Sequence, residues 1–513
     1  MNPDAGQSQT NCEAEPALRI HFIGGAEPLP ADVTPAVLGF KAFNLARMAA
    51  IGLKVPPAFV LGTDWCARQE MLTPDIWKTG LDQLEQATGL RLGDSRKPLL
   101  LSVRSGAPVS MPGMMETLLN IGLTDATLPG IIRMTGNPRL AWDAYRRLVA
   151  SYGEVVAGVD SRNFDADLDK LRGQTEERDL DFVALRDLTH LHLDTYKREA
   201  AAPFPQSADM QLQEAILAVF RSWKSEKAAA YRELHGLSHA MGTAVTVQRM
   251  IFGNGGGLSG AGVGFTRNPS DGNPAPWVDF LFNAQGEDVV SGRRSAKGHD
   301  ELAAVAPQVW SELVEANKLL ERHFGDMQDF EFTVQDGELY LLQTRTGKRT
   351  PQATARIALD LLDEGLIDSA TARERTRGLD AKALATRVVA ASDGNTLAPI
   401  SSAATAASGV VCGEIALDEA RVRERKAAGR QVILVRHGYH STGSGGRVAD
   451  TARRAHITCG CRRTATRQSL PCWLRRTFHR RDRRWAHDRR PGDAGRRSAD
   501  PGRQRRAHLR WRN

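Results

Sequence analysis

The last 63 residues of the chain differ in composition from everything before them, and this difference limits what the chain can fold into. Residues 451–513 contain 20 Arg and 4 Asp but no Lys or Glu, which gives this segment a net charge of +16. The whole chain carries +8, so residues 1–450 carry −8. The segment shows no helical or strand periodicity. We therefore expect the fold to be built from residues before about 436, and the basic charge to lie outside the folded surface.

Composition and the N-terminal residues narrow the class of protein. The chain has 513 residues, of which 41% are hydrophobic and 25% charged, and this is an ordinary globular composition for roughly two to four domains. The first residues are polar, and no stretch of roughly 18 apolar residues predicts a membrane span. Cys12, Cys66 and Cys412 are isolated in the sequence, as is typical of a reducing compartment. We expect a cytoplasmic protein with no membrane partner.

Alternating helical and strand patterns predict an α+β fold in several segments. Residues 100–106 form a short apolar run, 138–158 have the spacing of an amphipathic helix, and 301–324 form a longer helical stretch between strands. The predicted organisation is a leader at 1–19, a first region with a helical insert at 20–240, a strand-rich subdomain at 241–349, a helical linker at 350–396, the start of another domain at 397–436, and an aberrant, disordered tail at 437–513.

A β-hairpin is predicted around the turn at 336–337, where Asp-Gly separates two alternating runs. Asp329 and Glu331 share a face of the first strand, and Gln343 and Arg345 share a face of the second. A two-residue loop puts these pairs on opposite faces, whereas a three-residue loop with a glycine bulge brings them together. Together they would offer carboxylates to Mg²⁺ and a guanidinium to phosphate. The alternative is a solvated face with cross-strand ion pairs.

A second candidate site lies where the apolar run at 100–106 passes into a loop. Arg104 is predicted to lie in a loop rich in Ser, Gly and Pro, which can present backbone N–H groups and a guanidinium to an anion. The alternative is a turn beside a cluster of core methionines, because Met111, Met114 and Met115 can simply pack together.

Two further stretches have a phosphate-binding interpretation. The glycine-dense stretch 253–269 lies between two strands, either as a flexible flap over phosphates or as a mobile hairpin tip. Lys41 lies at the start of an amphipathic helix, where a lysine can hold a phosphate or be a surface charge. The chain contains no GxxxxGK[ST] motif and no GxGxxG in a strand-to-helix context, so neither a P-loop nor a Rossmann site is expected.

Taken together, these stretches resemble the pyruvate, phosphate dikinase family. The similar segments occur in the order of the family across about residues 20–436, which is its ATP-grasp-like nucleotide-binding half. The related pyruvate, water dikinases (phosphoenolpyruvate synthases) have a different arginine loop, without the MPGMMET of residues 111–117. The segments that carry the resemblance are 38–61, 101–123, 141–159, 219–233, 242–254, 262–272, 282–294 and 327–350.

The resemblance implies particular roles for residues of this chain. Arg104 and Arg345 would stabilise phosphate charge, Gly113 would belong to a phosphate-facing loop, and Asp329 and Glu331 would hold Mg²⁺. The residues implied to bind ATP are Lys41, Arg104, Gly113, Gln248, Asp279, Glu287, Gln343 and Arg345.

The chain departs from the family pattern at three positions. Phe40 stands between Gly39 and Lys41, where family members usually have a second glycine, and it is expected to crowd the nucleotide loop. Ala261 and Asp279 replace the usual Thr and Glu, which is expected to weaken contacts to ATP.

The family's next step uses a swivelling domain with a phosphorylated histidine in a Thr-Ser-His-Ala context. The β,γ-diphosphoryl group of ATP passes to that histidine, inorganic phosphate removes the γ group, and the phosphohistidine meets pyruvate in a C-terminal barrel. Residues 397–436 resemble the start of the swivelling domain, but the sequence contains no Thr-Ser-His-Ala and no barrel.

The tail is interpreted as a product of a one-base frame change near Arg453. Read one base later, residues 454–474 can encode a string that contains Thr-Ser-His-Ala and resembles the family's phosphohistidine segment. Out-of-frame reading of a GC-rich gene also explains the excess of Arg and the missing Lys and Glu. A zinc site at His456 and the tail cysteines matches no standard spacing, and an arginine-rich RNA-binding arm is the physical alternative.

These observations predict the ATP- and Mg²⁺-binding part of a pyruvate, phosphate dikinase that is incomplete and unable to run the full reaction alone. Phosphate would be a ligand of this part, pyruvate and phosphoenolpyruvate only of the complete parent enzyme, and the parent family implies a homodimer. The alternatives are an ATP-binding protein like pyruvate, water dikinase, or a protein that binds nucleic acid through its tail.

Overall fold

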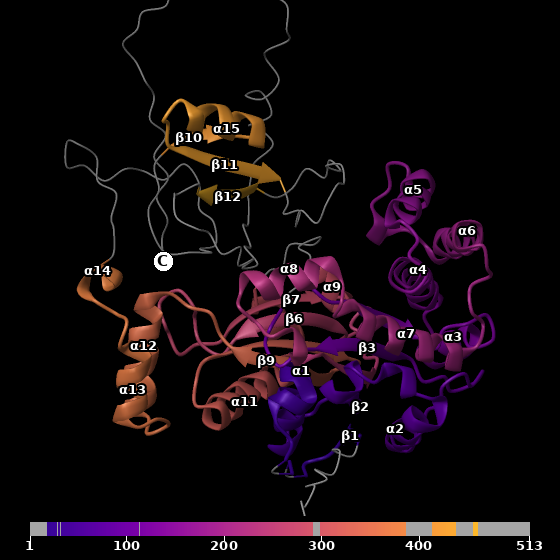
Figure 1. The fold of residues 1–513 in the computed structure, drawn as a ribbon, viewed down its shortest axis with the longest axis horizontal. Coiled ribbons are helices and arrows are strands. Elements are labelled where there is room, and N and C mark those ends of the chain that lie inside the picture. Colours follow the sequence, from indigo (N-terminus) through magenta and orange to yellow (C-terminus); the bar gives the residue numbers. More distant parts are fainter. Residues whose placement is uncertain are drawn as a thin grey trace, which may run out of the picture. The chain divides into compact units, whose positions relative to one another are not determined.

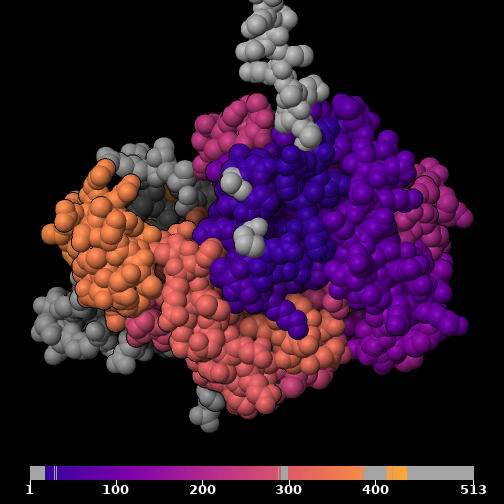
Figure 2. All heavy atoms as spheres, turned by 90° about the horizontal axis from the view of Figure 1, so that it is seen from below, coloured from indigo at the N-terminus to yellow at the C-terminus, as the bar shows by residue number. Residues whose placement is uncertain are grey.

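The computed structural model describes residues 18–27, 29–30, 32–111, 113–290, 298–385, 413–437 and 455–459 (Figure 1). These residues form a mixed α and β protein with largely antiparallel sheets. The chain divides into two compact units, of which the first comprises residues 1–261 and 330–345, and the second comprises 262–329 and 346–513. The indigo and purple residues of the first unit form one continuous surface in the space-filling view (Figure 2). The domain boundaries expected from the sequence stay predictions.

The first unit contains a five-stranded sheet with the order β1-β2-β5-β3-β4, in which every neighbouring pair is antiparallel. Arg104 lies inside this sheet, opposite Thr246 on one side and Thr117 on the other. The prediction that Arg104 lies in a loop was therefore wrong, because pairing on both sides extends the strand to Gly106. The strands are β1 Ile20–Ile23, β2 Ala58–Leu61, β3 Leu101–Gly106, β4 Thr117–Ile121 and β5 Ala244–Arg249.

Eight α-helices belong to the described part of the first unit, and several begin at a polar cap. The side chains of Asn137, Asp160 and Ser207 each accept a backbone N–H of the first helical turn, which satisfies a group that the helix itself leaves unpaired. The predicted helix at 138–158 is confirmed. The helices are α1 Pro35–Ala50, α2 Pro74–Thr88, α3 Leu128–Thr135, α4 Pro138–Val155, α5 Ser161–Arg172, α6 Phe182–Ala200, α7 Ala208–Ser222 and α8 Glu226–Leu234, with short 3-10 helices at Thr63–Cys66, Gln69–Met71, Glu177–Asp179 and His239–Met241.

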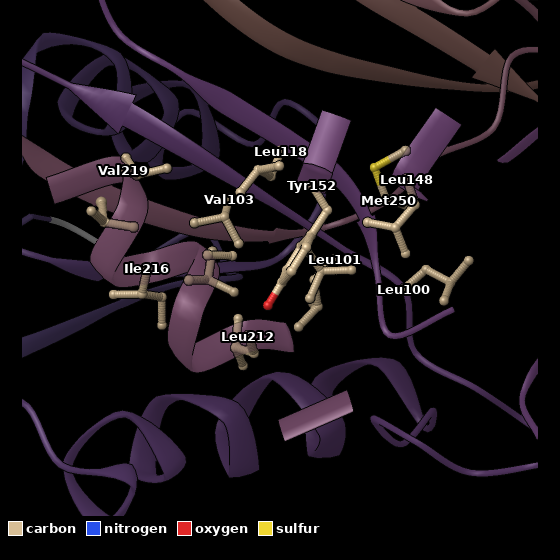
Figure 3. Packing of buried hydrophobic residues seen from close by; sticks show 14 of the residues in the cluster. Leu100, Leu101, Val103, Leu118, Leu148, Tyr152, Leu212, Ile216, Val219 and Met250 are labelled. Carbon is tan, nitrogen blue, oxygen red and sulfur yellow. The ribbon is translucent and has the colours of Figure 1, made fainter. Parts of the chain in front are cut away.

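The hydrophobic core of the first unit forms where α4 and α7 cover the five-stranded sheet. Tyr152 of α4 lies between Leu101 of β3 and Leu212 of α7 (Figure 3), and all three are at most 1% exposed. Met111 belongs to this core, and Met114 and Met115 pack against it. The packing interpretation of the methionines is therefore confirmed, and the core covers the side of β3 that carries Leu101 and Val103.

A second sheet has the order β7-β6-β8-β9, and the boundary between the two units runs through β6 and β8. The predicted helix at 301–324 is divided, because Pro307 lacks the N–H that would continue a helix and starts a new one. The strands are β6 Gly260–Phe265, β7 Trp277–Phe282, β8 Gln328–Gln335 and β9 Glu338–Thr346, and the helices are α9 Gly286–Val290, α10 Asp300–Val305, α11 Pro307–Phe324, α12 Pro351–Asp363, α13 Ser369–Thr376 and α14 Ala381–Leu384.

The β8–β9 hairpin has a two-residue turn. β8 ends at Gln335, β9 begins at Glu338, and both Asp336 and Gly337 have positive φ, of 53° and 82°. Positive φ at both central residues is the geometry of a type I′ turn. Of the two loops that the sequence allows, the structure thus has the shorter one, and the three-residue loop that would bring the polar pairs together is excluded.

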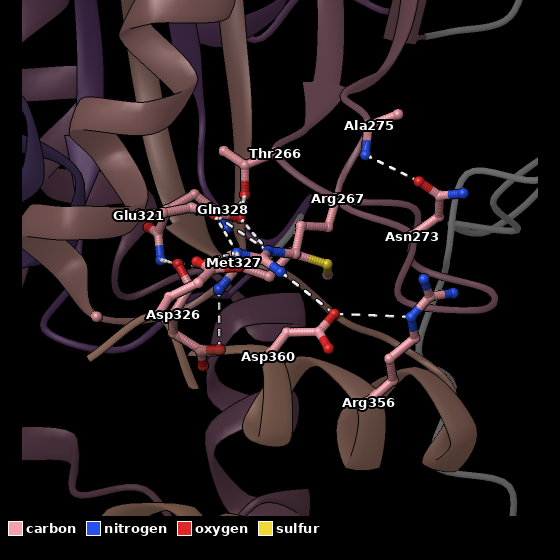
Figure 4. A network of polar contacts seen from close by, with 12 residues as sticks. Thr266, Arg267, Asn273, Ala275, Glu321, Asp326, Met327, Gln328, Arg356 and Asp360 are labelled. Atoms are coloured by element: carbon pink, nitrogen blue, oxygen red, sulfur yellow. Dashed lines mark hydrogen bonds and ion pairs between the residues drawn. The ribbon is translucent and has the colours of Figure 1, made fainter. Parts of the chain in front are cut away.

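Buried ion pairs organise the second unit (Figure 4). Arg267 is 3% exposed and lies 2.9 Å from Glu321, 2.8 Å from Glu364 and 3.5 Å from Asp360. Met327 packs with α12 residues such as Ile357 in a small core of this unit. The helices α12 and α13, which lie within the helical linker predicted at 350–396, pack on the rest of their own unit.

A three-stranded sheet lies near the end of the described chain. β10 Glu414–Ala416 is parallel to β11 Val432–His437, α15 Glu419–Ala427 connects them, and β12 Ala455–Cys459 pairs antiparallel with β11. The first residues of β11 are buried, as Val432 and Ile433 show. The expectation of a tail without regular structure from 437 was wrong for residues 455–459, which form a strand although their sequence is aperiodic. The rest of the tail lies outside the described residues.

Candidate functional site

The guanidinium of Arg104 is held by two neutral amides in the first unit. Its Nη1 lies 3.2 Å from Oε1 of Gln248 on β5, and its Nη2 lies 3.4 Å from Oε1 of Gln343 on β9. Gln248 is 2% exposed, and its own Nε2 donates to the carbonyl of Pro56 at 3.0 Å, which fixes the direction of the amide. These contacts orient Arg104, and since both partners are neutral amides they do not compensate its positive charge.

Lys41 is brought to the same site by a break near the start of α1. Gly39 has φ 71° and ψ 157° inside the helix, so the regular turns begin after it. A Cβ at Gly39 would lie 1.8 Å from the carbonyl oxygen of Gly106, so only glycine allows this approach to the end of β3. The N–H of Phe40 then donates to the carbonyl of Ala107 at 2.9 Å. Lys41 therefore follows a backbone contact to the strand that carries Arg104.

The electrostatic environment of Lys41 is positive. Burial and the nearby Arg104 guanidinium lower the pKa of Lys41 to about 8, the Glu331 carboxylate partly offsets this, and Arg345 lowers the pKa further. Within the part of the chain that the structure describes, Lys41 forms no hydrogen bond or ion pair closer than 4 Å. Two arginines act on this lysine against one carboxylate, which is an arrangement that an external polyanion would relieve.

Asp329 and Glu331 are the candidate metal ligands, and they occupy alternate positions of β8. Both are partly buried, and they alternate with the buried Phe330 and Phe332 along the strand. Among the described residues, no three His, Cys, Asp or Glu side chains gather as a complete protein cage for a metal ion. One or two carboxylates on a strand fit Mg²⁺, which usually keeps several waters and takes its other ligands from phosphates.

For the other predicted site residues, the structure gives the position in the fold. Gly113 has φ 70° in an exposed loop, with no atom within 4 Å of the position of a Cβ, so the structure leaves space beside it. Asp279 lies on β7 in the second unit and is 8% exposed. Glu287 lies on α9, and its side chain is outside the described residues. The structure thus gathers Lys41, Arg104, Gln248, Glu331, Gln343 and Arg345 in the first unit.

The glycine-dense loop between β5 and β6 is attached at both ends. Asn137 of α4 donates to the carbonyl of Gly255 at 3.2 Å, and the N–H of Asp336 donates to Ser259 Oγ at 3.0 Å. Gly256 and Gly257 have positive φ between these two contacts. The residues between these two hydrogen bonds are the part of the loop that could move as a flap without breaking them.

Sequence reasoning missed Asn44, which ties α1 to β9. Its Nδ2 donates to the carbonyl of Thr344 at 2.9 Å, and it is 4% exposed. The available signal was a polar residue three positions after Lys41 on the helix, at a position flanked by apolar residues. Phe40, which was expected to crowd the site, is partly buried.

The chain was compared with known proteins. Residues 69–310 and 299–365 match the family described as pyruvate phosphate dikinase, AMP/ATP-binding domain. The chain belongs to the pyruvate, phosphate dikinase family. The match extends over more than half of the chain and includes β3 with Arg104, β5 with Gln248, and the β8–β9 hairpin.

Individual relatives agree with this assignment. The chain is 45% identical over 342 residues to pyruvate, phosphate dikinase 2 of Zea mays, which covers 65% of this chain and 39% of the relative. It is 41% identical over 415 residues to pyruvate, phosphate dikinase of Clostridium symbiosum, covering 78% of this chain and 47% of the relative. The chain thus spans less than half the length of these relatives. A chloroplastic relative from Oryza sativa subsp. japonica is 41% identical over 410 residues.

A membrane-spanning helix is not found among the described residues, none of whose helices combines the necessary length and apolar character. The cytoplasmic location stays a prediction.

Proposed function

We propose that this chain is the ATP-binding part of a pyruvate, phosphate dikinase and that its cation cluster, Lys41, Arg104 and Arg345, holds the phosphates of Mg·ATP in an ATP-grasp-like site. The observation that carries the proposal is the uncompensated charge around Lys41. Burial, together with Arg104 and Arg345, lowers the pKa of Lys41 to about 8, and the residues that contact Arg104 are neutral amides. A triphosphate would bring negative charge to all three cations at once.

The carboxylates of Asp329 and Glu331 would hold Mg²⁺, which when bound neutralises phosphate charge. Glu331 already acts on Lys41, so the metal ligand and the phosphate-binding lysine share one electrostatic environment. Arg104 and Arg345 would then stabilise the charge that moves between phosphate oxygens. Gly113, Asp279, Glu287, Gln248 and Gln343 remain proposed ATP-binding residues by family resemblance.

The complete family reaction converts ATP, phosphate and pyruvate to AMP, diphosphate and phosphoenolpyruvate, and it needs a phosphohistidine. The printed sequence contains no Thr-Ser-His-Ala motif. We therefore expect the chain as given to bind Mg·ATP without forming phosphoenolpyruvate. The proposed frame change near Arg453 is tested by the nucleotide sequence across codons 430–515: a Thr-Ser-His-Ala one base away supports it, and its absence contradicts it.

Binding measurements on the full chain test the proposed site. Isothermal titration with Mg·ATP and with adenosine gives the two affinities for the wild type and for Arg345→Ala. We expect the substitution to weaken ATP binding by roughly tenfold or more and adenosine binding much less, because only ATP carries the phosphates that a guanidinium contacts. A folded wild-type chain without affinity for Mg·ATP, or equal losses for both ligands, would contradict a phosphate role.

The alternatives have less support. All the relatives named above are pyruvate, phosphate dikinases rather than pyruvate, water dikinases. Nucleic-acid binding through the arginine-rich tail concerns residues that lie largely outside the described structure. A salt-dependent affinity for RNA that disappears when residues 451–513 are deleted would support that alternative.

A further inference from the structure

Lys41 lies between two anchor points on α1. On one side, the N–H of Phe40 donates to the carbonyl of Ala107 at the end of β3. On the other side, the Nδ2 of Asn44 donates to the carbonyl of Thr344 on β9. β3 carries Arg104, while Thr344 stands between Gln343 and Arg345 in the sequence. The short segment 40–44 therefore touches both strands that supply the other cations.

Asn44 is an unusual residue for its position. It is 4% exposed in the middle of a helix, beside the buried Leu45 and Met48. Asparagine is a weaker helix former than leucine, and burying its amide is unfavourable unless the amide is hydrogen-bonded. An apolar side chain here would pack without that cost, but it would leave the carbonyl of Thr344, a residue that is 0% exposed, without this donor.

Helix geometry places Asn44 and Lys41 on the same side of α1. Residues three apart are neighbours on a helix surface. The contact that holds Asn44 against β9 therefore also fixes the distance of Lys41 from β9. Among the described strands, β9 is the edge strand of its sheet, so no other described strand pairs with its outer side. The N–H of Leu341 is bonded to the carbonyl of Lys54, and the carbonyl of Thr344 to Asn44. Asn44 is thus a side chain that ties this part of β9 to α1.

We propose that Asn44 is a positioning residue, which fixes Lys41 against Gln343 and Arg345 so that the cations can contact one polyphosphate together. This inference rests on the proposed function and assigns to it a residue that touches none of the reacting groups. It predicts that losing the Asn44 hydrogen bond weakens the contribution of Lys41 to phosphate binding rather than only the stability of the fold.

The test is a double-mutant cycle on the full chain with Mg·tripolyphosphate as the titrant. We expect Asn44→Leu to weaken binding by about tenfold, the loss typical of one misplaced charge-assisted contact. In a Lys41→Met background the same substitution should have a much smaller effect, because the lysine that it positions is gone. Equal effects in both backgrounds would overturn the inference.

The matched control is Asn317→Leu, the same substitution in the second unit. Asn317 lies on α11, is 3% exposed, and its amide atoms have no hydrogen-bond partner among the described residues. We expect no change in tripolyphosphate binding there. If Asn44→Leu does not fold, Asn44→Ser replaces it: the smaller side chain leaves room for a water molecule on the Thr344 carbonyl and should give an intermediate loss.

A ligand-free measurement separates this inference from the proposed function. Competitive acetylation of Lys41 as a function of pH reports its titration, for which we expect a midpoint of about 8 in the intact chain. We expect Asn44→Leu to move the midpoint upward, because a loosened α1 lets water reach the ammonium group. A shifted midpoint together with no tripolyphosphate binding by the wild type would refute the proposed function and keep the positioning role. An unchanged midpoint would refute the positioning role.

Discussion

The two units of this chain handle buried positive charge in opposite ways. In the second unit, Arg267 is surrounded by the carboxylates of Glu321, Glu364 and Asp360. In the first unit, Arg104 contacts two neutral glutamines, and Lys41 has no ion pair within the described residues. The first arrangement is complete by itself, whereas the second leaves positive charge for an external anion.

This contrast separates a structural arginine from a binding arginine. Arg267 is buried and Arg104 is partly buried, but the difference that matters for a ligand is the charge of the partner. A carboxylate removes the net charge that a ligand would meet, while an amide fixes the geometry and keeps the charge available.

The largest effect is expected from Arg267→Met. Removing the guanidinium leaves the buried carboxylate of Glu321 without its counter-charge, and breaking such a pair typically costs about 3–5 kcal/mol of the free energy of unfolding. Chemical denaturation of the full chain measures this loss. The affinity of the folded protein for Mg·ATP should stay close to that of the wild type, and a large loss of affinity with little loss of stability would reverse the assigned roles.

Arg104→Met should show the opposite pattern. We expect Mg·ATP binding to weaken by about 1.5–3 kcal/mol, the range for a hydrogen bond to a charged group, and the free energy of unfolding to change by less than about 1 kcal/mol. Calorimetric titration and chemical denaturation provide the two values. The contrast between the units fails if this variant loses several kcal/mol of stability and keeps its affinity.

The affinity for triphosphate should fall as the pH rises above about 8, where Lys41 loses its proton. Bound phosphate favours the charged lysine, so each pH unit above the midpoint should cost about tenfold in affinity, or about 1.4 kcal/mol, until the pKa of the complex is reached. Stability should change in the other direction, because the pKa of Lys41 is lower in the folded chain than its ordinary value of 10.5. The unfolded chain then holds more protons between pH 8 and 10.5, and folding becomes more favourable as the pH rises. Lys41→Met should remove both trends, and a pH-independent affinity in the wild type would contradict them.

The smallest effect is expected from Lys318→Ala on α11. Lys318 and Glu315 form an ion pair, but both side chains are more than half exposed. Water and salt screen such a pair, so its loss should change the free energy of unfolding by less than about 0.5 kcal/mol. Thermal denaturation at low and high salt measures this change. If Lys318→Ala lowered the free energy of unfolding as much as Arg267→Met, an exposed ion pair would stabilise the second unit as much as a buried one does.

Much of the local structure could be predicted from periodicity. The apolar spacing of 138–158 and the Asp-Gly turn at 336–337 correspond to α4 and the β8–β9 hairpin, because both signals depend on residues close in sequence. Arg104 was misplaced in a loop, since its strand is defined by pairing with Thr246, more than a hundred residues away. Strand ends that depend on distant partners leave little local signal.

The cation cluster of Lys41, Arg104 and Arg345 was only partly predictable from the sequence. A two-residue hairpin turn alone gives no reason for Glu331 and Arg345 both to act on Lys41, which comes from a distant part of the chain. The approach of Gly39 to Gly106 and the bond from Asn44 to Thr344 bring these elements together. Family resemblance could name the residues, but the contacts that position them depend on the tertiary structure.

The most direct test of the central claim is the titration of Lys41 with and without a polyphosphate. Competitive acetylation of the full chain, followed by mass spectrometry of the peptide that contains Lys41, gives its midpoint under both conditions. We predict a midpoint of about 8 for the free chain and a clearly higher midpoint, with slower labelling at pH 8, when Mg·tripolyphosphate is present. An identical midpoint and labelling rate with saturating Mg·tripolyphosphate would contradict the claim that the cation cluster of the first unit binds phosphates.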